Sequence, residues 1–308
     1  MAQSKLLVHP QKGAVDGVGH RITPASAGWR YVGFETRTLK QGAKSKLDTG
    51  DNEVCVVILS GKARVSVDGF DSGIIGERAS VFDGLPWSVY LPPDAAATIE
   101  AASDCQVALC SSPASGKFKA RVIKPGDVGT LTRGTGSNTR HVRNVLPEDA
   151  EAESVLVVEV ITPGGNWSSY PPHKHDRDAL PDESYLEETY YHRLKPAQGF
   201  ALQRIYTDDR SLDETLAVGD GDVVLVPKGY HPVGAPHGYD LYYLNVMAGP
   251  TRVWRFYNDP AHEWLMKQPA ASAPRLDSQG LKRAYLRRPE RRREASMSKA
   301  PNPDVTKP

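Results

Sequence analysis

Histidine residues are concentrated in one part of this 308-residue sequence. Five of the nine histidines lie between positions 173 and 237. His173 and His175 are two positions apart, a spacing that places both imidazole rings on one face of a β-strand. Neutral imidazole is a common ligand of divalent metal ions, although an isolated pair of this kind is most often a surface feature. The pair alone therefore does not establish a metal site.

Two residues further along the sequence would complete such a site. Glu188 opens the next strand-like run, and His231 follows a turn at residues 227–229. Three histidines and one glutamate give a mixed nitrogen and oxygen donor set that leaves coordination positions open for water or substrate. The alternative is that His231 caps a turn and Glu188 is a solvated strand residue. The expected ligands of one divalent metal ion are His173, His175, Glu188 and His231. Zinc, manganese, iron and nickel suit these donors about equally.

Short β-rich runs surround these residues and must position them. Glycine, proline, asparagine and aspartate separate the runs at spacings of about ten residues, which is typical of β-sandwiches and barrels rather than of alternating strands and helices. A polar, glycine-containing stretch at 130–139 interrupts the pattern, and one short helix is expected near 260–267. The predicted strands are residues 54–60, 63–67, 87–91, 97–101, 106–110, 154–161, 188–192, 200–206, 223–226 and 241–247.

The two halves of the sequence contain a weak internal repeat. An Asp-Gly turn at 83–84 leads through a strand to prolines at 92–93, and another at 220–221 leads through a strand to a proline at 227. Two tandem copies of one β-barrel would explain this repeat and the chain length. We therefore expect an all-β protein with an N-terminal domain at 1–125 and a C-terminal domain at 126–267.

The last part of the sequence differs in composition from the rest. Residues 268–308 contain ten Lys or Arg and four Asp or Glu, so the total charge of +1 combines a tail of +6 with a body of −5. The tail has few large apolar residues to bury, and we expect it to be disordered. No recognition motif accompanies its charge, so we interpret it as a solvated appendage and expect no nucleic-acid partner.

Composition also restricts the class of protein. No run approaches the roughly 18–20 apolar residues that span a bilayer, so no membrane segment is expected. The N-terminal sequence lacks the apolar core and the cleavage site of an export signal, which indicates a cytoplasmic protein. Three cysteines without Cys-x-x-Cys spacing fit a reducing compartment and no disulfide scaffold.

The arrangement of the expected ligands resembles the cupin signature. That signature consists of G-x₅-H-x-H, a glutamate, G-x₅-P-x-G and a final histidine. In this chain it reads as PPHKH, Glu188, the segment 221–229 and His231. Lys174, between the two paired histidines, is expected to point away from the metal.

Two departures from the signature leave alternatives open. The interval between His175 and the glutamate is longer than usual, so Glu183 and Glu187 are alternatives to Glu188. The last histidine follows the glycine after one residue where two are usual, so His237 is an alternative to His231.

Longer strings give a more specific resemblance. NWSSYPPHKHD, DGDVVLVPKGYHPVGAPHGYDLYYLNVMAGPTRVW and DPAHEW resemble the 5-deoxy-glucuronate isomerases of myo-inositol degradation, which are relatives of the 4-deoxy-5-keto-uronate isomerases. The resemblance covers about residues 5–267. It implies two tandem cupin (jelly-roll) barrels. Residues 92–95 (PPDA) stand where the second half has its turn and histidine, so we interpret the first barrel as metal-free.

The same resemblance implies the reaction, which is the aldose–ketose isomerisation of 5-deoxy-D-glucuronate to 5-dehydro-2-deoxy-D-gluconate. A metal ion would hold the C1 carbonyl and the C2 hydroxyl and acidify the C2 proton, and a base would move that proton. The candidates for proton transfer are Glu187, Tyr190 and His192. The candidates for substrate binding are Arg204, Arg143, Arg140 and His237, the arginines because a guanidinium pairs well with a carboxylate.

Two other functions are compatible with the pattern. A dioxygenase with the same four ligands would consume oxygen without forming the isomer. A non-catalytic sugar-acid-binding cupin would bind the uronate and leave it unchanged. Barrels of this type commonly associate, so we expect a homo-oligomer that acts on a small sugar acid.

Overall fold

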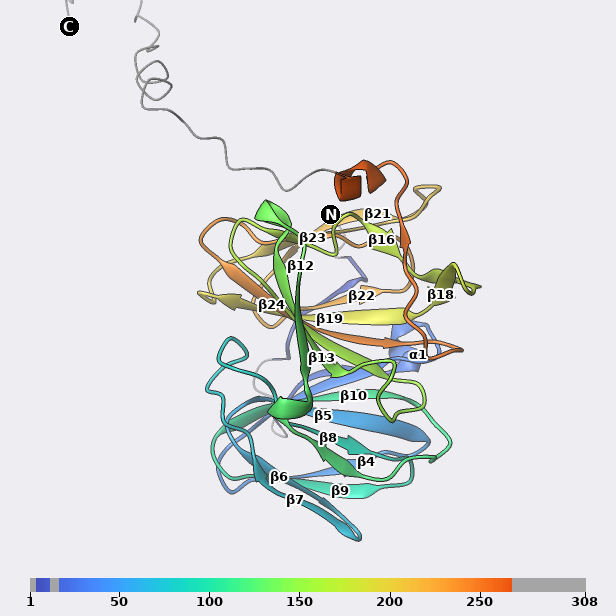
Figure 1. Cartoon of the computed structure of the whole chain (residues 1–308). Helices are drawn as coiled ribbons and strands as arrows, with labels where there is room; N and C mark the ends of the chain where they lie inside the picture. Colours follow the sequence, from blue (N-terminus) through green and yellow to red (C-terminus); the bar gives the residue numbers. More distant parts are fainter. Residues whose placement is uncertain (1–3, 12–16, 268–308) are drawn as a thin grey trace, which may run out of the picture. The chain divides into compact units, whose positions relative to one another are not determined.

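Two sets of β-strands, one in each half of the chain, build almost all of the described structure (Figure 1). The computed structural model describes residues 4–11 and 17–267. The predicted all-β class is confirmed, and the predicted disordered tail at 268–308 lies outside the described residues. The elements of the first half are β1 (Leu7–Val8), β2 (Val18–Ile22), α1 (Pro24–Ala27), β3 (Gly33–Leu39), β4 (Lys44–Asp48), β5 (Asn52–Ser60), β6 (Ala63–Val67), β7 (Phe70–Ile75), β8 (Ser88–Leu91), β9 (Ala96–Ala101), β10 (Cys105–Pro113) and β11 (Arg121–Ile123).

The second half contains the longer list of strands. They are β12 (Gly129–Arg133), β13 (Arg140–Leu146), β14 (Leu156–Thr162), β15 (Trp167–Ser168), β16 (His173–Lys174), β17 (Asp176–Ala179), β18 (Glu183–Tyr185), β19 (Glu187–Lys195), β20 (Ala201–Tyr206), β21 (Asp213–Val218), β22 (Val223–Val226), β23 (Val233–Gly234), β24 (Asp240–Ala248) and β25 (Tyr257–Asn258). Three 3₁₀ helices lie at Pro125–Asp127, Gly136–Asn138 and Glu263–Lys267.

Each half contains the eight strands of a jelly roll, divided between two sheets. In the first half one sheet contains the order β8-β5-β10-β3 and the other has the order β4-β9-β6-β7. The second half repeats this order as β22-β19-β24-β14 and β15-β23-β20-β21. The sequence repeat therefore corresponds to a repeated topology. The short strands β16, β17 and β18 lie between β15 and β19 and have no counterpart in the first half.

The strand ladders also relate individual residues of the two halves. Val54 pairs with Leu91 on β8, and Glu188 pairs with Val226 at the same place on β22. The ladders to β10 and β24 give the same correspondence. The resulting equivalent positions are Glu53 and Glu187, Val54 and Glu188, Val56 and Tyr190, and Ile58 and His192.

Alternation along the strands divides the apolar residues among three clusters. The first-barrel core lies inside the first jelly roll, the second-barrel core lies inside the second, and the shared core contains residues from the large sheets of both. Along β5, Val54, Val56 and Ile58 belong to the first-barrel core, and residues 55, 57 and 59 belong to the shared core. This strand is buried on both faces, so its sequence is a continuous apolar run rather than an alternating one.

The N-terminal segment joins the sheet of the other half. Strand β1 pairs antiparallel with β22, with Leu7 opposite Val224. The division of the chain at residue 125 stays a prediction, because residues 7–8 extend the second-half sheet.

Two further sequence expectations are refined by the structure. The polar stretch at 130–139 contains the turn of the β12–β13 hairpin, and β12 is exposed along most of its length, which explains its lack of an apolar pattern. The helix expected near 260–267 is the 3₁₀ helix Glu263–Lys267. Among the described residues, no helix is both long and apolar enough to cross a membrane.

Candidate metal centre

Glu188, His175 and His231 converge inside the second jelly roll. Glu188 lies on β19, His175 directly follows β16, and His231 lies in the turn between β22 and β23. Oε2 of Glu188 is 3.1 Å from Nε2 of His175 and 3.2 Å from Nε2 of His231. All three side chains are buried, and their ligand atoms lie within 4.8 Å of one another. These three residues can hold one metal ion.

The other ring nitrogen of each histidine is fixed by a backbone carbonyl. Nδ1 of His175 donates to the carbonyl of Leu186 at 2.9 Å, and Nδ1 of His231 donates to the carbonyl of Gly229 at 2.8 Å. In the neutral ring this leaves the lone pair on Nε2, directed toward Glu188. A backbone partner on the second nitrogen is the usual way in which proteins orient a histidine that binds a metal.

The electrostatics of the two rings differ. Burial lowers the pKa of His231 to about 4, so this ring is neutral at neutral pH. Burial also lowers the pKa of His175, but the hydrogen bond and negative charge of Glu188 outweigh it, and the net direction is upward. A cation between these groups would satisfy the carboxylate and both lone pairs, so the residues fit a divalent metal of intermediate softness.

His173 lies beside this group and outside it. The centroid of its ring is 5.0 Å from that of His231 and 6.5 Å from that of His175. The ring of Phe256 packs against it at 4.7 Å between centroids. Burial, reinforced by the neighbouring histidines, keeps the pKa of His173 well below its usual range. Its role as a fourth ligand stays a prediction.

The three candidate glutamates have different partners. Only Glu188, among these three, contacts the histidines. The carboxylate of Glu187 accepts three hydrogen bonds of 2.7–3.1 Å from the backbone N–H groups of residues 30–32. Glu183 accepts a hydrogen bond from Arg177 at 2.8 Å. The Glu187 carboxylate therefore contacts the first half, and its expected role in proton transfer stays a prediction.

Several expected substrate-binding residues lie away from the three-residue group. Arg204 forms a bidentate ion pair of 2.6 and 2.7 Å with Asp213 and is largely exposed. Arg143 donates to Glu159 at 3.4 Å, beside the contact between the halves. His237 is exposed in the turn between β23 and β24. Arg204 and Arg143 therefore have carboxylate partners and His237 is exposed, and the substrate-binding roles of these residues and of Arg140 stay predictions.

Tyr190 and His192 continue the inward face of β19 beyond Glu188. The Tyr190 hydroxyl is 2.9 Å from Oγ of Ser169, and burial keeps its pKa well above the usual range. Nε2 of His192 donates to the side-chain oxygen of Gln203 at 2.9 Å. Nδ1 of His192 then carries the lone pair and has no hydrogen-bond partner among the described residues. Burial lowers the pKa of this ring to about 4.

Several inward-facing positions of the neighbouring strands are also polar, and these residues are not among the site residues expected from the sequence. Gln203, Tyr243 and Asn245 lie among these positions, and Tyr243 shares a 2.6 Å hydrogen bond with Ser168. Period-two alternation in the string LYYLNVM carries a signal for Tyr243 and Asn245. Among the described residues, the buried polar atoms of this interior that lack a hydrogen-bond partner include Oγ1 of Thr162, Nδ1 of His192, Nε2 of Gln203, Nε2 of His231 and Nδ2 of Asn245.

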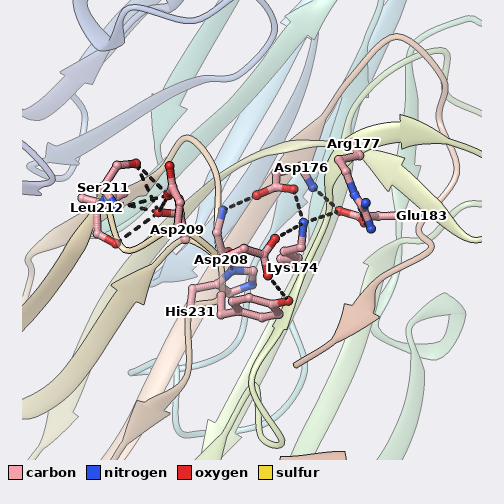
Figure 2. Close-up of polar contacts among 12 residues, drawn as sticks. Lys174, Asp176, Arg177, Glu183, Asp208, Asp209, Ser211, Leu212 and His231 are labelled. Carbon is pink, nitrogen blue, oxygen red and sulfur yellow. Dashed lines mark hydrogen bonds and ion pairs between the residues drawn. The ribbon is translucent and has the colours of Figure 1, made fainter. Parts of the chain in front are cut away.

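A buried lysine, Lys174, connects through its ion pairs the segments that carry His175 and His231 (Figure 2). Nζ of Lys174 is 2.7 Å from Asp176, 3.2 Å from Asp208 and 3.6 Å from Glu183. Asp176 in turn accepts the backbone N–H of Gly229 at 2.8 Å, two residues before His231. We call Lys174, Asp176, Glu183 and Asp208 the lysine cluster. Its geometry agrees with the expectation that Lys174 is turned away from the metal-capable group.

A repeated jelly roll with such an interior group defines the cupin-like class of proteins. A solved structure of oxalate decarboxylase from Lactobacillus farciminis has this fold, with a TM-score of 0.59 and 13% identity over 87% of this chain and 92% of that chain. The family is more specific. The model of the KduI/IolB family matches residues 6–265, and the chain therefore belongs to this family.

Individual relatives agree with this assignment. The 5-deoxy-glucuronate isomerase of Geobacillus kaustophilus is 53% identical over 270 residues, which cover 87% of this chain and 98% of that protein. The enzyme of the same name from Bacillus subtilis is 52% identical over 86% of this chain and 100% of that protein. The crystal structure of an IolB-like protein from Salmonella typhimurium has a TM-score of 0.83 and 48% identity, covering 85% of this chain and all of that one. The predicted family and the predicted enzyme class, an isomerase, are confirmed.

Proposed function

We propose that this chain is a metal-dependent aldose–ketose isomerase that converts 5-deoxy-D-glucuronate to 5-dehydro-2-deoxy-D-gluconate in myo-inositol degradation. The observation that carries the proposal is the identity of about half of all residues with relatives named for this substrate, over nearly their whole length. The buried group of Glu188, His175 and His231 supplies a site for the chemistry. The cytoplasmic location and the homo-oligomeric state stay predictions from the sequence.

The metal would be held by His175, Glu188 and His231, with His173 as the proposed fourth ligand. When bound, a divalent ion supplies a positive charge that polarises the substrate carbonyl and acidifies the adjacent hydroxyl-bearing carbon. Backbone carbonyls hold both histidine rings in the required tautomer before the ion arrives. The donor set leaves room for substrate oxygens, as in other catalytic sites.

His192 is the proposed acceptor of the proton that leaves C2. Its ring is neutral at neutral pH, and its Nδ1 lone pair has no partner in the described structure. The hydrogen bond to Gln203 fixes the proton on the opposite nitrogen. The Tyr190 hydroxyl, which stays protonated because burial raises its pKa, can donate a hydrogen bond to the substrate oxygens. Return of that proton to C1, together with transfer of the hydroxyl proton from O2 to O1, completes the isomerisation without any net oxidation.

Turnover of 5-deoxy-glucuronate by the purified full-length chain tests this proposal. Product formation followed by NMR is expected in the metal-loaded protein and is expected to disappear after chelation. One or more of Zn²⁺, Mn²⁺, Fe²⁺ and Ni²⁺ should restore it. His175→Ala is expected to lose both metal and turnover, whereas His141→Ala, which removes an exposed histidine on β13, should keep both. Absence of product from the loaded protein would overturn the isomerase assignment, and full turnover after chelation would overturn the metal dependence.

A further inference from the structure

The β12–β13 hairpin places two arginines directly opposite each other. Arg133 ends β12, Arg140 begins β13, and the two are partners in the ladder. Side chains of directly opposed residues lie on the same face of a sheet, where two like charges destabilise the pair. A negative charge bound between the two guanidinium groups would remove this unfavourable term.

The described part of the chain supplies no acidic partner to either guanidinium. Arg140 Nη1 donates to the backbone carbonyl of Asn138 at 3.0 Å, and Arg133 lies over the ring of Trp254 at 5.6 Å. Other arginines of this half do have carboxylate partners, such as Arg193 with Asp220 and Arg177 with Glu183. Arg140 is also substantially buried, and burial together with the charge of Arg133 lowers its pKa. The pair is therefore a concentrated, uncompensated positive charge.

This charge lies next to the candidate metal centre. Arg140 interacts electrostatically with Tyr190 and Tyr243, whose side chains lie in the second-barrel core. A continuous line of aromatic contacts also joins Arg133 to His173. Trp254 and Phe256 lie 6.2 Å apart, and Phe256 and His173 lie 4.7 Å apart, between ring centroids.

The hairpin turn is anchored to the segment that leads to the paired histidines. The side-chain amide of Asn138 donates to the carbonyl of Tyr170 at 3.2 Å, and that of Asn166 donates to the carbonyl of Thr139 at 2.9 Å. Two buried polar atoms in this region, Oδ1 of Asn138 and Nε1 of Trp254, lack partners. The turn is thus held in place, and of these two atoms the indole N–H of Trp254, next to Arg133, is a donor without an acceptor among the described residues.

We infer that Arg133 and Arg140 form a carboxylate-binding pair that selects the acid end of the sugar substrate. This inference rests on the proposed function, since it assigns the recognition of the substrate of the same site. A guanidinium matches a carboxylate through two parallel hydrogen bonds, which lysine cannot reproduce. The pair distinguishes a sugar acid from the neutral sugar that has a hydroxymethyl group at the same carbon.

Kinetics with an acidic and a neutral substrate test the pair. Arg140→Met and Arg133→Met are each expected to raise KM for 5-deoxy-glucuronate about 10- to 100-fold, since hydrogen bonds to charged groups are of this strength. They should leave kcat/KM for 5-deoxy-glucose, which lacks the carboxylate, and the metal content within about twofold of the parent. Arg140→Lys keeps the charge and should give an intermediate KM. Arg64→Met, which removes an exposed guanidinium paired with Asp71 in the first half, should change neither substrate's kinetics.

Binding of 5-deoxy-glucuronate, measured by calorimetry on the metal-loaded protein, separates the inference from the proposed function. If the parent binds the acid without turning it over, the isomerase proposal fails while loss of binding in the arginine variants still supports the pair. If the parent turns the acid over and the methionine variants keep its KM, the pair is refuted. Equal losses on the acidic and the neutral substrate would show a structural role and would also refute it. Should Arg140→Met fail to fold, Arg140→Lys and Arg133→Met give the same decision.

Discussion

Strands β5 and β19 occupy the same place in the two jelly rolls and carry opposite kinds of side chain into their interiors. Val54, Val56 and Ile58 on β5 pack in the first-barrel core. Glu188, Tyr190 and His192 occupy the equivalent positions on β19. The first interior is therefore apolar at these three positions, whereas the second carries ionisable and hydroxyl groups there, and Nδ1 of His192 lacks a hydrogen-bond partner among the described residues.

On their outer faces, by contrast, the same two strands carry similar side chains in the two halves. Glu187 accepts the backbone N–H groups of residues 30–32, which lead into β3. Its equivalent, Glu53, accepts those of residues 153–155, which lead into β14. In each jelly roll, one glutamate thus accepts hydrogen bonds from the backbone that leads into a strand of the other jelly roll. The comparison shows that the glutamate contacts between the two halves are alike, whereas only the interior of the second half contains a candidate metal centre.

Replacement of Glu188, which stands where β5 has Val54, should give the largest loss of metal binding and turnover. Glu188→Ala is expected to lose bound metal and to lower kcat/KM more than about 100-fold, beyond the loss typical of a group that only supports a ligand. Val54→Ala at the equivalent position should cost about 2 kcal/mol of unfolding free energy and leave metal content and kcat unchanged. Metal analysis, steady-state kinetics and urea unfolding measure these quantities. Metal retained by the first variant, or lost by the second, would contradict the division between the interiors.

The buried His192, where the first half has Ile58, predicts a pH dependence of stability. The pKa of His192 falls from 6.5 to about 4 on folding because the ring is buried. As pH falls below 6.5 the unfolded chain takes up this proton first, so the metal-free protein loses stability until pH reaches about 4. The difference between the two pKa values corresponds to about 3 kcal/mol. Urea unfolding should show this additional loss in the parent and not in His192→Leu, and parallel pH profiles of the two would disprove it.

The reciprocal glutamates predict matched losses of stability. Glu53→Gln and Glu187→Gln each weaken three hydrogen bonds to a charged acceptor and should each cost about 2 kcal/mol of unfolding free energy. Glu187 adjoins Glu188 in sequence, so only its variant is expected to weaken metal binding as well, in competition titrations with a chelator. Equal metal affinities in the two variants would show that the contact is purely structural.

Lys174 lies in the segment that the first half lacks, and its replacement should have the smallest of these effects. Lys174→Met leaves Asp176, Glu183 and Asp208 without their shared cation and should lower metal affinity about 10-fold, within the range for groups that orient ligands. The absorption spectrum of the Co²⁺-loaded protein should shift if the ligands move. Arg177→Met removes an exposed partner of Glu183 and should leave the spectrum unchanged. An unaltered affinity and spectrum in Lys174→Met would limit the lysine cluster to a structural role.

Local periodicity predicted the all-β class, and the spacing of the histidines and glutamates predicted a set of candidate ligands. Glu188, His175 and His231 belong to that set, but the sequence left Glu183, Glu187 and His237 open as alternatives. Alternation placed Glu187 and Glu188 on opposite faces but could not say which face was inward. That choice depends on the pairing of β19 with β22 and β24, which joins residues far apart in sequence.

Other features had no local signal. Strand β4 has one buried residue in five, so the string KSKLD gives little indication of a strand. The pairing of Arg133 with Arg140 becomes visible only when the polar stretch between them closes into a hairpin. The ion pair between Arg204 and Asp213 depends on the register of β20 against β21, which no local pattern specifies.

Strand β1 has a consequence for the order in which the protein is made. Leu7 and Val8 leave the ribosome long before Val223 and Val224, the residues with which they pair. The strands of the first jelly roll can therefore all be synthesised before β1 has a partner. The sheet of the second jelly roll, in turn, lacks its end strand until β1 pairs with β22. A fragment that began at residue 126 would expose β22, the strand that leads to His231, as an unpaired edge open to other chains.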